Sequence, residues 1–135
     1  MQRKAQDGTM AAIFRTVFLF WWGGLIYCGV EVLWRGRTHG SMFVAGGLSL
    51  AAINLIYGAL WQTSRLATLL LCGICISVIE FAVGYVVNLK LGLQVWDYSD
   101  RKFNIMGQVC PLYTFLWVLL SVPAVVLCRI CDFIF

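Results

Sequence analysis

Two glutamates lie inside long apolar segments of this 135-residue chain. A carboxylate in a membrane helix is costly unless it is paired, protonated or hydrated, so these two residues are the first candidates for function. Arg35 follows Glu31 by one helical turn, the order that favours an ion pair within one helix, so Glu31 could equally be structural. No basic residue lies within two helical turns of Glu80 in the same apolar segment. Glu80 therefore needs a partner from elsewhere, a cation, water or a proton, and it is the stronger candidate.

Other polar residues could complete a site with these glutamates. Asn54 lies in the second apolar segment, where its amide can hydrogen-bond across a helix contact. His39, the only histidine, lies in the loop before that segment. Trp96 and Tyr98, in the loop before the fourth segment, are expected to anchor it at the membrane surface. The predicted residues for binding a solute or ion are Glu31, Glu80, Asn54, Arg35, His39, Trp96, Asp97, Tyr98 and Asn104.

The sequence contains none of the familiar signatures of soluble enzymes. It has no phosphate-binding glycine loop, no H-E-x-x-H and no nucleophile elbow. Its two C-x-x-C pairs, at residues 72–75 and 128–131, lack further ligands at metal-site spacing, and we interpret these cysteines as small packing residues. We therefore predict no catalytic set, metal site or cofactor, and another chain would have to hydrolyse ATP in an ATP-driven system.

These residues must be positioned by membrane helices, as the composition shows. Hydrophobic residues make up 61% of the chain and charged residues only 12%, too little charge to cover a soluble domain. The net charge of +4 suits contact with anionic lipid headgroups and gives no support to nucleic-acid binding. Charged residues divide the chain into four spans of about 20 residues or more. We predict an all-α membrane protein, a four-transmembrane-helix bundle with one integral domain over residues 1–135 and helices at about 13–34, 41–62, 66–88 and 104–128.

The first and third spans resemble each other. Residues 24–31 align with residues 73–80, and in both a glycine stands seven positions before a glutamate. The two spans would cross the membrane in the same direction. The alignment therefore suggests two parallel helix-hairpin repeats. We also expect the polar faces of the four helices, Asn54 included, to converge on one interior that contains both glutamates.

Four crossings would place both termini on one side of the membrane, but the distribution of basic residues does not fix which side. The count is five on each side, so one interpretation is dual topology, in which copies insert both ways and pair. The other is that Arg35 and Arg37 serve a site and should not be counted. Excluding them favours cytoplasmic termini in a cell or plasma membrane, and we prefer this interpretation.

Several stretches of the sequence resemble a known family. Residues 80–85 (EFAVGY), 96–99 (WDYS) and 103–108 (FNIMGQ) are similar to the signature of the ABC-transporter type IV, or CmpB-like, membrane proteins. Vertebrate transmembrane protein 229 carries a similar pattern. The first half agrees too, through residues between 31 and 47, and the resemblance covers roughly residues 20–120. It implies a small multi-pass membrane protein and a connection with transport, without assigning roles to single residues.

Three functions remain open on the sequence alone. The leading hypothesis is a transport or permeation component for a small solute or cation, with its site around Glu31 and Glu80. A bundle this small would need a second chain to form a pathway. That chain would be a second copy, giving a homodimer, or a partner membrane chain or ATPase chain. The second hypothesis is a non-transporting scaffold or regulatory subunit. The third is a small intramembrane enzyme acting on a lipid, with Glu80, His39 and Asp97 as acid–base candidates.

Overall fold

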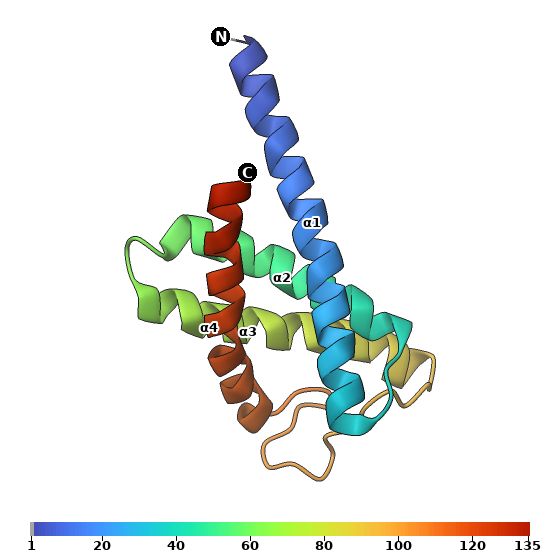
Figure 1. The fold of residues 1–135 in the computed structure, drawn as a ribbon. Coiled ribbons are helices and arrows are strands. Elements are labelled where there is room, and N and C mark those ends of the chain that lie inside the picture. The colour runs from blue at the N-terminus through green and yellow to red at the C-terminus, as the bar shows by residue number, and fades with distance from the viewer. Residues whose placement is uncertain (1) are drawn as a thin grey trace.

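The chain folds into four long helices, as a computed structural model that describes residues 2–135 shows (Figure 1). They are α1 (Gln2–Arg35), α2 (Gly40–Leu60), α3 (Arg65–Gly84) and α4 (Pro111–Ile134), and α3 continues into a short π-helix, η1 (Tyr85–Lys90). Each long helix, with η1 added to α3, has the length and hydropathy needed to cross a membrane. The predicted all-α class with four membrane spans is confirmed.

The predicted starts of two helices are wrong, and the last helix ends at Ile134 instead of residue 128. The first helix begins at Gln2 instead of residue 13, because its first turns contain good helix formers and no proline. The fourth begins at Pro111 instead of residue 104, since proline suits the first turn of a helix. Met106 and Gly107 have φ angles of 55° and 73°, which a right-handed helix cannot accommodate. Asn104 therefore lies in the preceding loop and not on a face of α4.

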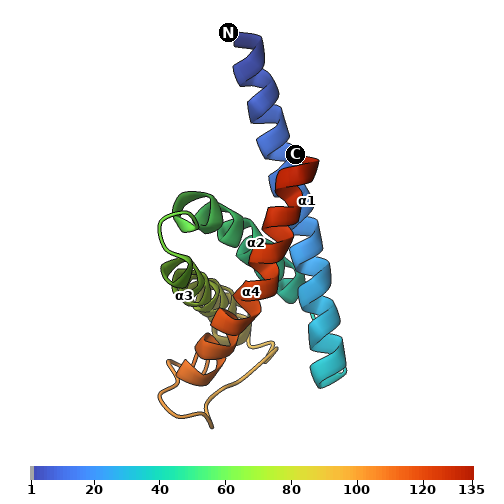
Figure 2. The same ribbon diagram turned by 60° about the vertical axis from the view of Figure 1, so that its left-hand side comes forward.

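The helices pack as two pairs, α1 with α2 and α3 with α4, and the two helices of each pair cross each other. Figures 1 and 2 show α2 and α3 side by side, running across α1 and α4. Close contacts within each pair use glycine: Gly23 of α1 meets the backbone of α2 at Gly46, and Gly73 of α3 meets Val118 of α4. Small residues at such crossings let membrane helices approach closely. Gly24, the predicted repeat counterpart of Gly73, likewise faces the second helix of its own pair, at Phe43. The repeat itself stays a prediction.

The core lies between the helices, and lipid-facing side chains cover the outside. Cysteines 72, 128 and 131 are fully buried in this core, as expected for small packing residues. Many large apolar side chains point outward instead, among them Leu33 at 90% exposed and Leu55 at 72%. Such a surface would be unfavourable in water and is suited to lipid. The buried core cluster consists of Leu19, Leu50, Ile53, Cys72, Ile76, Val125, Cys128 and Cys131.

The loop at residues 91–110 is pinned to the end of α3 by buried polar contacts. Asn88 donates to the side-chain carbonyl of Gln108 at 2.7 Å and accepts from the backbone amide of Val95 at 2.7 Å. The indole of Trp96 donates to the Gln108 backbone carbonyl at 3.1 Å, and its ring packs against Gly84. Trp96 is only 4% exposed, so its predicted role as a membrane-surface anchor is wrong. These contacts fix the path of the loop.

Candidate functional site

Glu80 is buried near the end of α3 and is held by two neutral donors. Its side chain is 4% exposed. The Tyr98 hydroxyl donates to Oε1 at 2.9 Å, and the Trp117 indole donates to Oε2 at 3.0 Å. Tyr98 comes from the pinned loop and Trp117 from α4, so the partners of Glu80 do come from other segments. Tyr98 points inward to this carboxylate, which corrects its predicted role as a surface anchor.

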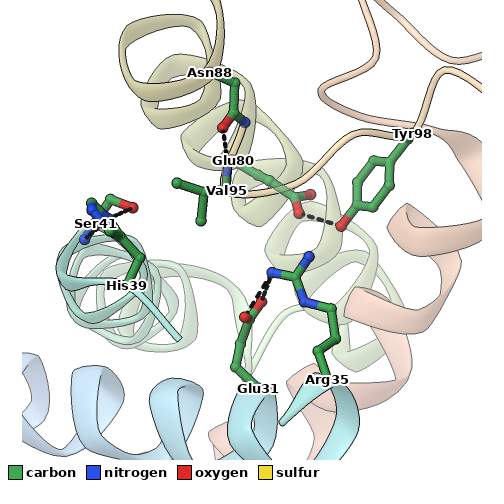
Figure 3. Close-up of polar contacts among 8 residues, drawn as sticks. All are labelled: Glu31, Arg35, His39, Ser41, Glu80, Asn88, Val95 and Tyr98. Carbon is green, nitrogen blue, oxygen red and sulfur yellow. Dashed lines mark hydrogen bonds and ion pairs between the residues drawn. The ribbon is translucent and has the colours of Figure 1, made fainter. Parts of the chain in front are cut away.

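Glu31 and Arg35 form the ion pair that their spacing predicts. One guanidinium nitrogen, Nη2 of Arg35, donates to both carboxylate oxygens of Glu31, at 2.9 and 2.7 Å. The pair lies at the end of α1, where Gly36 with a φ of 73° stops the helix. Figure 3 shows the guanidinium of Arg35 between the Glu31 carboxylate and the Glu80–Tyr98 pair. The two glutamates therefore approach one space from α1 and α3.

Further aromatic rings pack against Tyr98 and Trp117, the two donors to Glu80. The Tyr27 and Trp117 ring centroids are 5.8 Å apart, and those of Trp117 and Tyr113 are 6.4 Å apart. Tyr98 stacks on Tyr113 with a centroid separation of 4.5 Å and an interplanar angle of 8°. We refer to Glu31, Arg35, Glu80, Tyr98 and Trp117 as the glutamate site, with Tyr27 and Tyr113 as its aromatic wall.

The charges of the glutamate site do not balance when both carboxylates are ionised. Two carboxylates then face a single guanidinium, and the remaining partners are a phenol and an indole. Burial raises the pKa of Tyr98 far above its usual value, and the nearby charge of Glu80 is the second cause of this increase. Tyr98 therefore keeps its proton at physiological pH and can donate to Glu80. Two ionised carboxylates beside one guanidinium leave a net negative charge, which can attract a cation.

His39 and Asp97, two further predicted site residues, make local contacts instead. His39 caps the start of α2: its Nδ1 accepts from the Ser41 backbone amide at 3.1 Å and lies 2.8 Å from the Ser41 hydroxyl. Asp97 accepts from both the backbone amide and the hydroxyl of Ser99, and these hydrogen bonds lower the pKa of Asp97. Within residues 2–135 the ion pairs are Arg15–Asp132 and Arg35–Glu31, so Asp97 is held by hydrogen bonds alone.

Asn104 also shapes the loop and does not reach the glutamates. Its amide nitrogen donates to the Arg101 carbonyl at 2.8 Å, and its oxygen accepts from the Gly107 amide at 2.9 Å. These bonds stabilise the turn in which Gly107 has a positive φ. Asn104 therefore supports the segment that carries Tyr98, as do the Asn88 and Gln108 contacts that the sequence reasoning missed.

A second polar cluster, which we call the Arg15 cluster, joins three helices. Arg15 of α1 donates to Asn54 of α2 at 2.9 Å, to Asp132 of α4 at 2.7 Å and to the Cys128 carbonyl at 2.9 Å. The hydroxyl of Tyr57 donates to the other Asp132 oxygen at 2.5 Å. These side chains line an open pocket of about 280 Å³. The expectation that Asn54 joins the glutamates is wrong, because the crossing of the helices carries it to Arg15.

Several residues of both clusters were missed from the sequence. Arg15 was interpreted only as the flank of the first span. Asp132, the only acidic residue after position 100, was a signal that a charge lies in the last apolar run and could need a basic partner. Tyr27 and Trp117 gave no signal beyond being aromatic residues in apolar runs. Within residues 2–135, no group of three or more histidine, cysteine, aspartate or glutamate side chains gathers in a way that could hold a metal ion.

Comparison with known proteins identifies the chain at the level of the family. No curated protein matches the chain, and neither does any solved structure. The family match spans α2, α3, the pinned loop and nearly all of α4, together with the part of α1 that carries Arg15, Glu31 and Arg35. Because residues 14–133 match the family described as "Putative ABC-transporter type IV", the chain belongs to this family of multi-pass membrane proteins.

Proposed function

We propose that the chain is the membrane-spanning component of a transport system and that its glutamate site binds a small cation or cationic solute. The observation that carries the proposal is the convergence of Glu31 and Glu80 on one guanidinium, that of Arg35, in apolar surroundings. A net negative charge attracts a cation more strongly there than in water, because the effective dielectric constant is lower. The family description supports the connection with transport.

The proposal includes a second chain. Four helices leave little room for a pathway of their own, and the sequence contains no phosphate-binding glycine loop. We therefore propose that a second copy completes the pathway or that a partner chain supplies ATP hydrolysis. Cytoplasmic termini belong to the same proposal, since an ATPase partner would dock on that side.

One observation favours a different role, that of a scaffold whose polar interior only fixes the packing of the helices. Within the described residues, every buried polar side-chain atom of α1 to α4 and their loops has a hydrogen-bond partner. A fully satisfied interior of this kind can stabilise a bundle without binding anything. The scaffold role predicts that a change at Glu80 lowers stability and alters no flux.

The experiment that separates the two roles is a flux measurement with Glu80→Gln. Glutamine keeps an oxygen that can accept from Trp117 and removes the charge. Purified wild-type and variant chains are placed in liposomes, and uptake of Na⁺, K⁺, guanidinium and tetraethylammonium is measured. We expect at least one of these cations to enter with wild type and its uptake to fall about tenfold or more with Glu80→Gln, a loss of about 1.4 kcal/mol in interaction with the site.

The matched control is Asp7→Asn, which removes a carboxylate from an exposed position in the first turns of α1. Its flux should equal that of wild type. If wild type moves none of the four cations, or if Glu80→Gln moves them as fast as wild type, the proposed transport role of the glutamate site is wrong.

A further inference from the structure

We propose that the solute of the glutamate site is a small organic cation, a guanidinium or an alkylammonium, and that it takes the place that the Arg35 guanidinium holds. This inference rests on the proposed function and names its substrate class. Arg35 would then be a built-in competitor that fills the site when no solute is bound. Three features support the proposal: the position of Arg35, the chemistry of the wall, and the charge balance of the exchange.

The position of Arg35 shows that the site can hold a planar organic cation. Its guanidinium is paired with Glu31 and lies beside the Glu80–Tyr98 pair (Figure 3). The side chain is also free to leave, because Arg35 is the last residue of α1 and Gly36 begins an exposed loop. No helix has to unfold when this side chain swings outward.

The wall of the site suits an organic cation better than a metal ion. Calcium takes about six to eight oxygen ligands, and magnesium requires a nearly octahedral oxygen shell. The glutamate site offers two carboxylates, the Tyr98 hydroxyl and the Trp117 indole, and the aromatic wall of Tyr27 and Tyr113 packs against these two donors. Alkylammonium and guanidinium ions bind well to aromatic faces next to a carboxylate. These groups therefore favour an organic cation.

The exchange of one cation for another keeps the charge of the site constant. Glu31 and Arg35 lie at its rim, with side chains 13% and 28% exposed, whereas Glu80 is 4% exposed in the interior. An incoming cation would meet Glu31 first and displace Arg35 into the loop. Because one positive charge replaces another, the exchange adds no further uncompensated charge to the buried site, and uncompensated buried charge is the arrangement that costs most.

The test compares the affinities of the full-length chain and its variants for defined cations. Calorimetric titration of purified protein in lipid nanodiscs uses tetraethylammonium and guanidinium as probes and K⁺ as the inorganic control. We expect wild type to bind at least one organic probe about tenfold more tightly than K⁺. Arg35→Gln should tighten that binding about tenfold, because removing a competitor raises the competent fraction of the protein. Glu80→Gln should weaken it about tenfold or more.

The matched control is Arg3→Gln, which removes an exposed arginine from the other end of the same helix and should leave affinity unchanged. Thermal melting of each variant checks that it is folded. Weaker binding by a folded Arg35→Gln would overturn the displacement proposal, because Arg35 would then help to hold the solute. If K⁺ binds as tightly as both organic probes and depends on Glu80, the substrate class is wrong while the transport role stands. If neither binding nor flux depends on Glu80, the proposed function itself fails.

Discussion

Arg15 and Arg35 both belong to α1 and both pair with a carboxylate, but one ion pair links separate helices and the other lies within a single helix. The Arg15 pair reaches Asp132 of α4 and is joined by residues of α2, so it ties three helices together. The Arg35 pair closes within α1 and ties no helix to another. Glu80, beside it, is held only by neutral donors. A charge pair between helices stabilises a bundle, whereas a pair within one helix can open while the packing stays intact.

The largest expected effect separates the two arginines by stability. Arg15→Gln removes donors to Asn54, Asp132 and Cys128, and we expect the free energy of unfolding to fall by about 1–3 kcal/mol, the usual cost of leaving such partners unsatisfied. Arg35→Gln should lower it by only about 0.5 kcal/mol, the value typical of a pair one turn apart on a helix. Reversible unfolding in mixed detergent micelles measures both values. Equal losses would remove the distinction between the clusters.

A smaller effect separates two tyrosines that each donate to a carboxylate. Tyr57→Phe removes the hydroxyl bond to Asp132, and Tyr98→Phe removes the one to Glu80. Each change should lower the free energy of unfolding by about 0.5–1.5 kcal/mol, the usual net value of one hydrogen bond. Only Tyr98→Phe should alter the affinity for an organic cation, as measured by the same titration. An equal change in affinity with Tyr57→Phe would contradict separate roles for the clusters.

The smallest effect concerns pH and the loop that carries Tyr98. The hydrogen bonds from Ser99 lower the pKa of Asp97 in the folded chain, so their stabilisation is present above the unfolded value of about 3.9. It is lost as the pH falls below that value and through the lower folded pKa. The Ser99 amide signal in NMR spectra should therefore shift only below about pH 4, and Asp97→Asn should abolish this transition. A transition of this signal near pH 6 would be evidence against the assignment.

The parts of the fold that follow from local sequence were predictable. The lengths of the apolar runs gave four membrane helices, and the spacing of four residues gave the Glu31–Arg35 pair. The start of α4 was not predicted, because residues 104–110 are apolar enough to fit either a helix or a loop. Only the positive φ angles at Phe103, Met106 and Gly107 show where the helix cannot form.

The parts of the site that depend on tertiary structure were not predictable. Periodicity shows which residues share a face of a helix, but it does not show which end of another helix that face meets. The crossing of α2 over α1 therefore took Asn54 to Arg15, away from the glutamates. In the same way, the bond from Tyr98 to Glu80 depends on a loop path that Asn88 and Gln108 fix from positions distant in sequence.

The length of α1 has a consequence for the shape of the molecule in its membrane. A helix of 34 residues is about 50 Å long, whereas the hydrocarbon layer of a bilayer is about 30 Å thick. Roughly two fifths of α1 must therefore stand outside the hydrocarbon. Glu31 and Arg35 lie at the opposite end of this helix from the exposed residues 3–10, which include Arg3, Lys4 and Asp7. The chain thus carries a charged helical extension outside the hydrocarbon, at the end of α1 opposite the glutamate site.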